Sequence, residues 1–221
     1  MAVNKEAYLE LCRELKAAGA TLIAVSKTKP VEDILALYTF GQRDFGENYV
    51  QEMVDKQAIL PKDIRWHFIG HLQSNKVKYI AAFVHLIHGV DSFKLLLEIN
   101  KQAAKHNRII NCLLQVHIAE EETKFGMNEA ELNDAINRLA DANTNNIKVT
   151  GLMAMASLSE DAARVGSEFK YLKSLFDKYS ILPSGNQELS ILSMGMSGDY
   201  KIAIAEGSNM VRIGSLLFGI R

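Results

Sequence analysis

Residues 21–30 read TLIAVSKTKP, a mostly apolar run of five residues followed by serine, two lysines, threonine and proline. Apolar and β-branched residues bounded by polar residues and proline are typical of a short buried β-strand. The turn at 26–30 contains no glycine, whereas the first strand of a doubly wound nucleotide-binding sheet is often followed by a glycine-rich turn. The segment therefore favours another parallel α/β architecture over the doubly wound sheet, which is the alternative fold.

Similar apolar runs recur along the chain and alternate with amphipathic, helix-like segments. The patterns predict strands at 21–26, 44–46, 66–70, 84–90, 109–118, 147–155, 189–192 and 210–213. Helices are predicted at 5–18, 31–40, 48–59, 74–82, 92–106, 128–141, 159–179 and 198–206. Strands that alternate with helices form parallel βαβ units, and eight such units close into a barrel. We therefore expect a single (β/α)8 TIM barrel domain over residues 1–221, in which the extra N-terminal helix covers the position of an eighth helix.

Composition excludes several classes of function. The formal net charge is −1, from 25 basic and 26 acidic residues, which gives no electrostatic reason to expect nucleic acid or an anionic membrane as a partner. Cys12 and Cys112 are the only cysteines, too few for a disulfide framework. No window has the roughly 18 apolar residues that a membrane-spanning helix needs, and the N-terminus lacks a signal-peptide pattern. We expect a cytoplasmic protein.

The lysine that follows the first strand is a candidate nucleophile. Side chains alternate along a strand, so Val25, Lys27 and Lys29 share one face if the extended geometry continues that far. Burial and a like-charged neighbour both lower the pKa of a lysine, and a neutral amine attacks carbonyl groups. Lys27 is therefore a candidate for Schiff-base chemistry, although most lysines at strand ends are simply solvated.

The loops after the last two strands have the composition of a phosphate site. They read SMGMSG (193–198) and RIGS (212–215), and barrel enzymes commonly bind phosphate with the loops after strands seven and eight. Their glycines allow backbone N–H groups to approach an anion closely. Ser197 occupies the N-cap position of the helix predicted at 198–206, and Ser215 offers a second hydroxyl. Tight turns with a capping serine are the ordinary alternative.

No metal site is predicted. His67 and His71 on one strand would lie about 13 Å apart, too far to share one ion. His85 and His88 would face opposite sides of the next strand. We expect these histidines to be hydrogen-bonded in the interior or exposed to solvent.

Seven segments, in order along nearly the whole chain, together resemble one family. They are AVSKTKP (24–30), FGEN (45–48), HFIGHLQSNK (67–76), KFG (124–126), GLM (151–153), LSMGMS (192–197) and VRIG (211–214). In this combination the chain resembles the pyridoxal phosphate homeostasis proteins, single-barrel relatives of the N-terminal domain of bacterial alanine racemase.

The resemblance implies a cofactor and its binding residues. Lys27 would hold pyridoxal 5′-phosphate as an internal aldimine, Asn48 would line the pocket near the ring, and Arg212 would face the pyridine nitrogen. The Ser197 loop and the backbone at 214–215 would bind the phosphate. The full set of implied cofactor-binding residues is Lys27, Asn48, Ser193, Ser197, Arg212, Gly214 and Ser215. Lys29 and Lys124 are further candidates for handling the aldehyde during loading or release.

The resemblance also implies a protein that binds, stores or delivers pyridoxal phosphate in vitamin B6 homeostasis without catalysis, with apo-enzymes that need this cofactor as candidate recipients. Racemases of this barrel type are two-domain dimers that take a second catalytic base, a tyrosine, from an added β domain. No residues after the eighth strand could build that domain, so we assign no catalytic residue and expect a monomer.

Two other functions remain open from the sequence. The first is a pyridoxal phosphate enzyme with weak racemase or decarboxylase activity on amino acids, in which a second base would come from Tyr49, Tyr79, Tyr200 or Lys124. The second is a cofactor-free Schiff-base lyase that acts on a phosphorylated carbonyl substrate. Turnover of amino acids would identify the first, and a protein that never binds the cofactor would favour the second.

Overall fold

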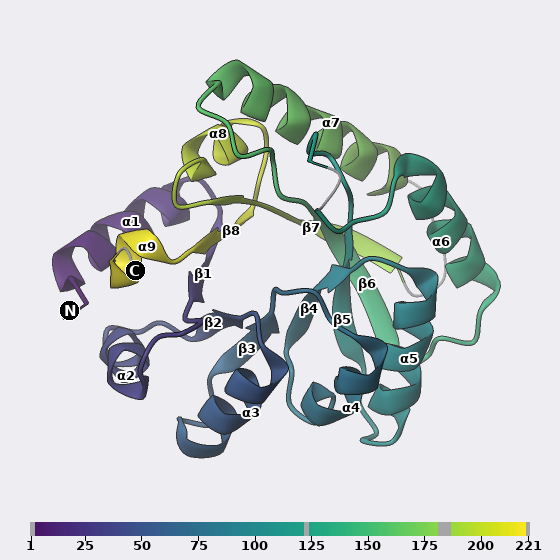
Figure 1. Cartoon of the computed structure of the whole chain (residues 1–221), viewed down its shortest axis with the longest axis horizontal. Helices are drawn as coiled ribbons and strands as arrows, with labels where there is room; N and C mark the ends of the chain where they lie inside the picture. Colours follow the sequence, from purple (N-terminus) through teal and green to yellow (C-terminus); the bar gives the residue numbers. More distant parts are fainter. Residues whose placement is uncertain (1–2, 122–123, 181–186, 220–221) are drawn as a thin grey trace.

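Eight parallel strands close into a barrel in the computed structural model, which describes residues 3–121, 124–180 and 187–219 (Figure 1). The strands are β1 (Thr21–Val25), β2 (Asp44–Glu47), β3 (Arg65–Phe68), β4 (Leu86–Val90), β5 (Ile110–Gln115), β6 (Ile147–Met153), β7 (Gln187–Met196) and β8 (Met210–Ile213). Each strand pairs with the next, and β1 pairs with β8, with Ile23 opposite Arg212. The predicted TIM barrel is therefore confirmed.

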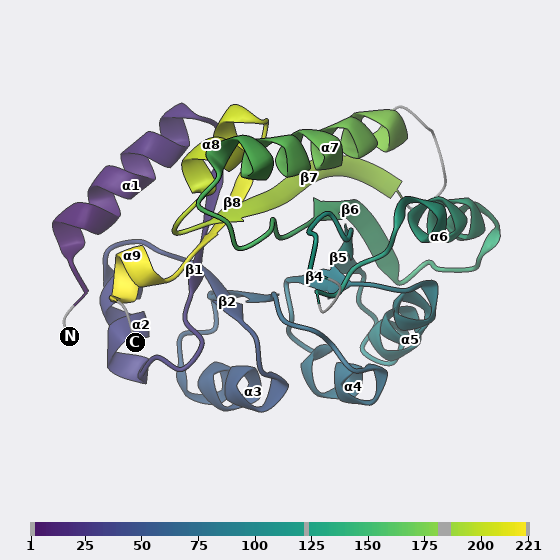
Figure 2. The same ribbon diagram turned by 45° about the horizontal axis from the view of Figure 1, so that its top comes forward.

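Helices surround this barrel on its outer side (Figure 2). They are α1 (Lys5–Ala17), α2 (Val31–Thr39), α3 (Val50–Ile59), α4 (Val77–Ile80), α5 (Phe93–Ala104), α6 (Glu129–Asp141), α7 (Ala162–Ser180), α8 (Tyr200–Ala205) and α9 (Ser215–Phe218). A 3-10 turn, η1 (Ser74–Lys76), precedes α4. Their apolar faces pack on the strands and form the main core of the protein.

Helix α1 covers the outer side of the barrel between α2 and α8, as both ribbon views show. The hydroxyl of Tyr200 in α8 donates a hydrogen bond to Glu14 of α1 at 3.0 Å. At the other side of α1, the hydroxyl of Tyr8 donates to Gln42 at 3.2 Å. The leading helix α1 therefore precedes β1 and covers this part of the barrel, where it contacts the single turn α9 that follows β8.

Three elements differ from the predictions. The region 74–82 forms only η1 and the single turn α4, and α9 follows β8 where no helix was predicted. Strand β7 runs to Met196, four residues past its predicted end, with a register shift against β8 between Ser193 and Met196. Gly195 has φ +96°, and a Cβ there would lie 2.6 Å from the Cβ of Ala203, so a glycine is needed for β7 to pack against α8.

The barrel interior contains both apolar and polar side chains. Five side chains form its apolar cluster, namely Ile23, Leu86, Leu113, Met153 and Met210. The rest of the interior holds His67, His88, Ser193 and Arg212, each no more than 4% exposed. Interiors of such barrels are usually filled by bulky apolar residues, and a buried polar group destabilises the fold unless it is hydrogen-bonded. These polar side chains therefore require a complete set of hydrogen-bond partners.

Candidate functional site

A pocket of about 290 Å³ opens at the carboxyl ends of the strands and contains six of the seven predicted cofactor-binding residues. Its lining consists of Val25, Lys27, Asn48, Ile69, Met155, Met196, Ser197, Gly198, Arg212, Gly214 and Ser215. The seventh predicted residue, Ser193, does not line the pocket but lies fully buried and bonded to Arg212. The fold thus brings a lysine from the first strand to the serine- and glycine-containing loops of the last two.

Lys27 lies in a tight turn directly after β1. The N–H of Lys29 donates to the carbonyl of Ser26 at 3.0 Å, and Thr28 between them has φ +62°. The extended geometry therefore ends before Thr28, and the prediction that Lys29 shares a face with Lys27 is wrong. The ammonium of Lys29 instead donates to the carbonyl of Phe218 at 3.1 Å, at the end of α9.

A buried ion-pair network holds this turn on both sides of the lysine. The ammonium of Lys56 in α3 donates to the Ser26 carbonyl at 2.7 Å, to Glu47 at 2.8 Å and to Glu52 at 2.7 Å. Glu52 also accepts the backbone N–H of Thr28. Burial raises the pKa of Glu47, and the nearby Lys56 cation opposes that shift. Sequence reasoning missed this network, because a lysine on an amphipathic helix normally indicates a solvated face.

Arg212 forms part of the pocket wall, and hydrogen bonds to Ser193 and Ala154 fix its guanidinium. One of its terminal nitrogens, Nη1, donates to the Ser193 carbonyl at 2.9 Å and to the Ser193 hydroxyl at 2.7 Å. The other, Nη2, donates to the carbonyl of Ala154 at 2.9 Å. Burial lowers the pKa of Arg212 to about 10, so the guanidinium stays cationic at neutral pH. The pocket therefore contains a permanent, rigidly held positive charge.

Two buried histidines, His88 and His67, extend the hydrogen bonds from Ser193 further into the barrel interior. The Ser193 hydroxyl lies 3.2 Å from His88 Nδ1, and His88 Nε2 lies 3.0 Å from His67 Nδ1. His67 Nε2 lies 3.0 Å from Asp44 Oδ1. Burial lowers the pKa of both imidazoles, which favours their neutral forms. The prediction that these two histidines are hydrogen-bonded in the interior is confirmed.

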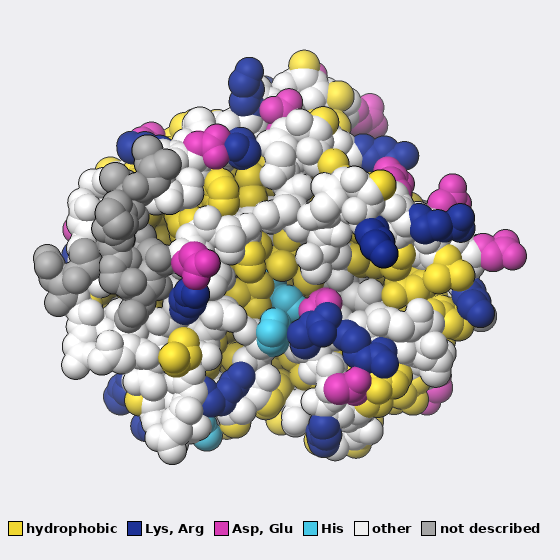
Figure 3. Space-filling model, turned by 180° about the vertical axis from the view of Figure 1, so that it is seen from behind, with side chains coloured by type: hydrophobic (Ala, Val, Ile, Leu, Met, Phe, Trp, Pro, Cys, Tyr) yellow, Lys and Arg dark blue, Asp and Glu magenta, His cyan; other side chains and the backbone are white. Residues whose placement is uncertain are grey.

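The other two predicted histidines lie at the surface. His71 pairs with Asp91 at 3.1 Å and stacks on Phe125, while His85 is exposed. Seen from behind in Figure 3, histidine side chains lie near the centre of the face beside basic and acidic groups. Within the described part of the chain, no group of three or more His, Cys, Asp or Glu residues could hold a metal ion.

The loops after β7 and β8 meet at the edge of the pocket, though not through the predicted helix cap. Helix α8 begins at Tyr200 with Asp199 at its N-cap position, so the prediction that Ser197 caps it is wrong. The hydroxyl of Ser197 instead accepts the backbone N–H of Gly214 at 3.2 Å. This bond joins the two loops. The helix that begins at the pocket is α9, whose first residue is Ser215.

A second pocket, of about 390 Å³, shares part of its lining with the Lys27 pocket. Lys124 lines it, and its ammonium donates to the carbonyl of Ala156 at 2.7 Å and to Glu121 at 3.0 Å. Met196 and Gly198 belong to both pockets. Lys124 therefore lies beside the Lys27 pocket but does not line it.

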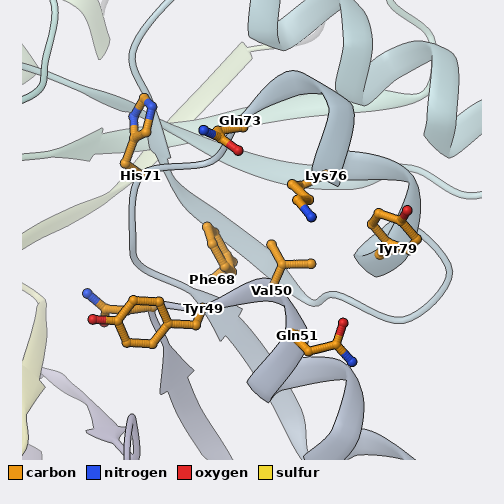
Figure 4. A pocket seen from close by; sticks show the side chains of 9 residues that line it. Tyr49, Val50, Gln51, Phe68, His71, Gln73, Lys76 and Tyr79 are labelled. Carbon is orange, nitrogen blue, oxygen red and sulfur yellow. The ribbon is translucent and has the colours of Figure 1, made fainter.

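A third pocket, of about 430 Å³, adjoins the site at Asn48, which lines both (Figure 4). Phe68 and Val50 lie at its centre, with Tyr49 and Tyr79 on opposite sides of them. The Oδ1 atom of Asn48 is buried and has no hydrogen-bond partner in the described structure. Buried polar atoms are normally paired, so this oxygen is an available acceptor at the wall shared by the two pockets.

The candidate second bases all lie outside the Lys27 pocket. Tyr49 and Tyr79 line the third pocket, and Lys124 lines the second. Tyr200 is buried, and that burial, together with its hydrogen bond to Glu14, raises the pKa of its hydroxyl to about 12. Among the described residues that line the Lys27 pocket, none is a tyrosine, a histidine or a carboxylate.

Comparison with solved structures identifies close relatives of this barrel. PipY from Synechococcus elongatus, solved with pyridoxal phosphate bound, superposes with a TM-score of 0.88 at 35% identity, covering 97% of this chain and 99% of PipY. The same protein without the cofactor gives a TM-score of 0.90. Alanine racemase from Bartonella henselae shares only the fold, with 16% identity, a TM-score of 0.69 and 60% of its length covered.

Sequence comparison points the same way. The family described as the N-terminal domain of alanine racemase matches residues 5–221. The pyridoxal phosphate homeostasis protein of Aquifex aeolicus is 42% identical over 203 residues, which cover 91% of this chain and 87% of the relative. That of Escherichia coli K12 is 38% identical over 205 residues, covering 91% and 86%. The chain therefore belongs to the pyridoxal phosphate homeostasis protein family, whose barrel is related to the N-terminal domain of alanine racemase.

Proposed function

We propose that this protein binds pyridoxal 5′-phosphate through a Schiff base on Lys27 and acts as a non-catalytic carrier of the cofactor. The observation that carries the proposal is the composition of one pocket, which unites Lys27, the Ser197 and Ser215 hydroxyls and the buried Arg212 cation. The relatives named as homeostasis proteins, and PipY with its bound cofactor, support it.

The residues of the pocket fit the chemical groups of the cofactor. The Lys27 amine condenses with the aldehyde, with loss of water. Ser197, Ser215 and the backbone at Gly214 supply hydroxyl and N–H donors for the phosphate. The buried, unpartnered Oδ1 of Asn48 is an acceptor for a donor on the ring. An orphaned buried acceptor in the pocket wall is the feature that a ring with a hydroxyl group would satisfy.

Arg212 explains why the bound cofactor would stabilise carbanions only weakly. When bound, pyridoxal phosphate supplies an electron sink that stabilises carbanions, and the sink is strongest with a protonated ring nitrogen. A guanidinium facing that nitrogen donates a hydrogen bond and disfavours a second positive charge there. Arg212 would therefore hold the ring nitrogen unprotonated, which would weaken the electron sink.

The surroundings of Lys27 also favour a carrier. Stereochemical inversion needs a second positioned acid or base, and the described lining of the pocket contains no tyrosine, histidine or carboxylate. Recipient apo-enzymes, a monomeric state and a cytoplasmic location complete the proposal. In the part of the chain that the structure describes, no helix is long and apolar enough to cross a membrane.

An absorbance spectrum of the purified protein, followed by borohydride reduction and peptide mass mapping, tests the proposal. We expect a near-visible Schiff-base band and a phosphopyridoxyl adduct on Lys27. Lys27→Ala should remove the adduct and keep the fold, while Lys105→Ala, at an exposed lysine after α5, should keep both. A colourless protein that does not take up added pyridoxal phosphate would overturn the proposal in favour of the lyase. Turnover of amino acids that depends on Lys27 would instead favour a weak racemase or decarboxylase.

A further inference from the structure

A continuous line of hydrogen bonds crosses the barrel interior, from the pocket toward the opposite end of the barrel. We call it the lumen relay and define it as Arg212, Ser193, His88, His67 and Asp44. Its four links measure 2.7, 3.2, 3.0 and 3.0 Å in that order. These residues come from β8, β7, β4, β3 and β2, so the bond between β4 and β7 spans the interior rather than joining neighbouring strands.

Asp44 fixes the direction of these hydrogen bonds. Burial alone would raise its pKa, but hydrogen bonds from Arg65 and His67 outweigh burial and hold the pKa below its usual range. An ionised carboxylate only accepts, so His67 Nε2 must donate to it. Because a neutral imidazole has one donor and one acceptor, His67 Nδ1 then accepts from His88 Nε2. Every donor in this part of the relay points toward Asp44.

The same rule determines the hydrogen bonds at the pocket end. His88 Nδ1 is left as an acceptor, so it accepts a hydrogen bond from the Ser193 hydroxyl. The Ser193 oxygen, whose O–H donates to His88, uses a lone pair to accept from Arg212 Nη1. One arrangement therefore satisfies all four links with both histidines neutral. The Ser193 hydroxyl at the pocket end of this chain is thereby oriented toward Arg212 Nη1, and it holds the guanidinium together with the carbonyls of Ser193 and Ala154.

Packing alone gives no reason for these polar residues. Leu86, Leu113 and Met153 fill neighbouring parts of the interior without any hydrogen-bonding demand. Polar side chains buried at this depth weaken the fold whenever one link is missing, because a donor or acceptor is then left unpaired. Such a network can rigidify a site that depends on exact orientation, and Arg212 is the one member of the relay that reaches the pocket.

We propose that His67 and His88 are positioning residues of the cofactor pocket, which act through Ser193 to aim Arg212 at the ring nitrogen of bound pyridoxal phosphate. The proposal rests on the proposed function, since it needs that cofactor in the Lys27 pocket. The histidines touch neither the cofactor nor Lys27. Their effect is confined to the one hydrogen bond that Arg212 offers to the ring.

A cofactor analogue with carbon in place of the ring nitrogen, 1-deazapyridoxal 5′-phosphate, isolates that hydrogen bond. The measurement is the ratio of dissociation constants for the analogue and for pyridoxal phosphate. In the wild-type protein we expect pyridoxal phosphate to bind about ten-fold more tightly, the value of one charge-assisted hydrogen bond. In His88→Leu the ratio should fall toward one, because the Ser193 hydroxyl is then free to rotate and Arg212 keeps only the Ser193 and Ala154 carbonyls as fixed acceptors. Leu113→Val, which alters interior packing outside the relay, should keep the wild-type ratio.

Each outcome has a defined meaning. A variant that weakens both ligands equally and keeps the wild-type ratio would overturn the proposal, because a purely structural histidine acts on both alike. If His88→Leu does not fold, Ser193→Ala removes the same link with a smaller change and should also bring the ratio toward one. A wild-type protein that binds both ligands equally would also refute the proposal while leaving the carrier function intact. A wild-type protein that binds neither ligand would refute the proposed function, and the relay proposal with it.

Discussion

Replacing Lys56 with methionine should destabilise the fold more than any surface lysine substitution, and in a pH-dependent way. The Lys56 side chain is 8% exposed and its main partner Glu47 is fully buried, so the substitution leaves a carboxylate without its cation in the interior. Removing one partner of a buried ion pair typically costs about 3–5 kcal/mol. The Ser26 carbonyl also loses its donor.

Glu47 limits this cost by taking up a proton, which sets the pH dependence. Burial already raises the pKa of Glu47 above its usual value of 4.5, and loss of Lys56 removes the cation that opposes the shift. Keeping Glu47 neutral in the folded state costs about 3 kcal/mol at pH 7 and roughly 1 kcal/mol at pH 5.5. Since the unfolded carboxyl releases its proton, the stability of Lys56→Met falls as the pH rises.

Urea denaturation of the wild-type protein and Lys56→Met at pH 5.5 and pH 7 measures both quantities. A double variant, Lys56→Met with Glu47→Gln, removes the buried charge as well and should regain most of the lost stability, with little dependence on pH. The reasoning would be refuted by a Lys56→Met protein within 1 kcal/mol of the wild type at both pH values. That result would mean that water reaches Glu47 and screens its charge.

Three further predictions concern single positions. Gly195→Ala should lower the free energy of unfolding by about 2 kcal/mol or more, because φ is +96° and a Cβ would clash with α8, whereas Gly198→Ala, with nothing within 4 Å, should cost little in thermal denaturation. Burial holds the pKa of His88 well below 6.5, so the unfolded state takes up a proton that the folded state does not. Stability should therefore fall by about 1 kcal/mol from this group between pH 6.5 and 5.5, and His88→Leu should lack that part of the pH dependence. Ser197→Ala should weaken pyridoxal phosphate about ten-fold in a fluorescence titration, and an unchanged affinity would remove Ser197 from the phosphate site.

The barrel could be predicted because its evidence is local and repeated. Eight apolar runs alternate with amphipathic segments, and each observed strand overlaps a predicted one. The errors lie where tertiary packing decides. Residues 193–196 contain glycine and serine and were predicted as a loop, yet they continue β7 because Gly195 lets the chain pack on α8. The four-residue helix α9 is too short for a periodic pattern, so nothing in the sequence could show it.

The residues that line the candidate pocket could be predicted from the sequence, but the hydrogen-bond networks that hold them in place could not. Strand ends on one rim of a barrel meet in space, which is enough to bring Lys27, Ser197 and Arg212 to one pocket. The network around Lys56 depends on which face of α3 packs against the turn after β1, a geometry that helical periodicity alone does not specify. The pairing of His67 with His88 likewise depends on the stagger of β3 and β4.

Two independent supports hold the Lys27 turn and the Arg212 side chain of the pocket, and they come from opposite sides of the barrel wall. Outside the barrel, Lys56 and Glu52 bind the backbone on either side of Lys27. Inside it, the lumen relay ends on Arg212. The loops that would bind the phosphate are joined to each other by the bond from Gly214 to Ser197, which a phosphate would compete for, since both groups line the pocket. This asymmetry suits the proposed carrier. The aldehyde and the ring would meet a preformed site, while the phosphate end would exchange one protein hydrogen bond for bonds to the ligand, which lowers the net gain on binding and eases release.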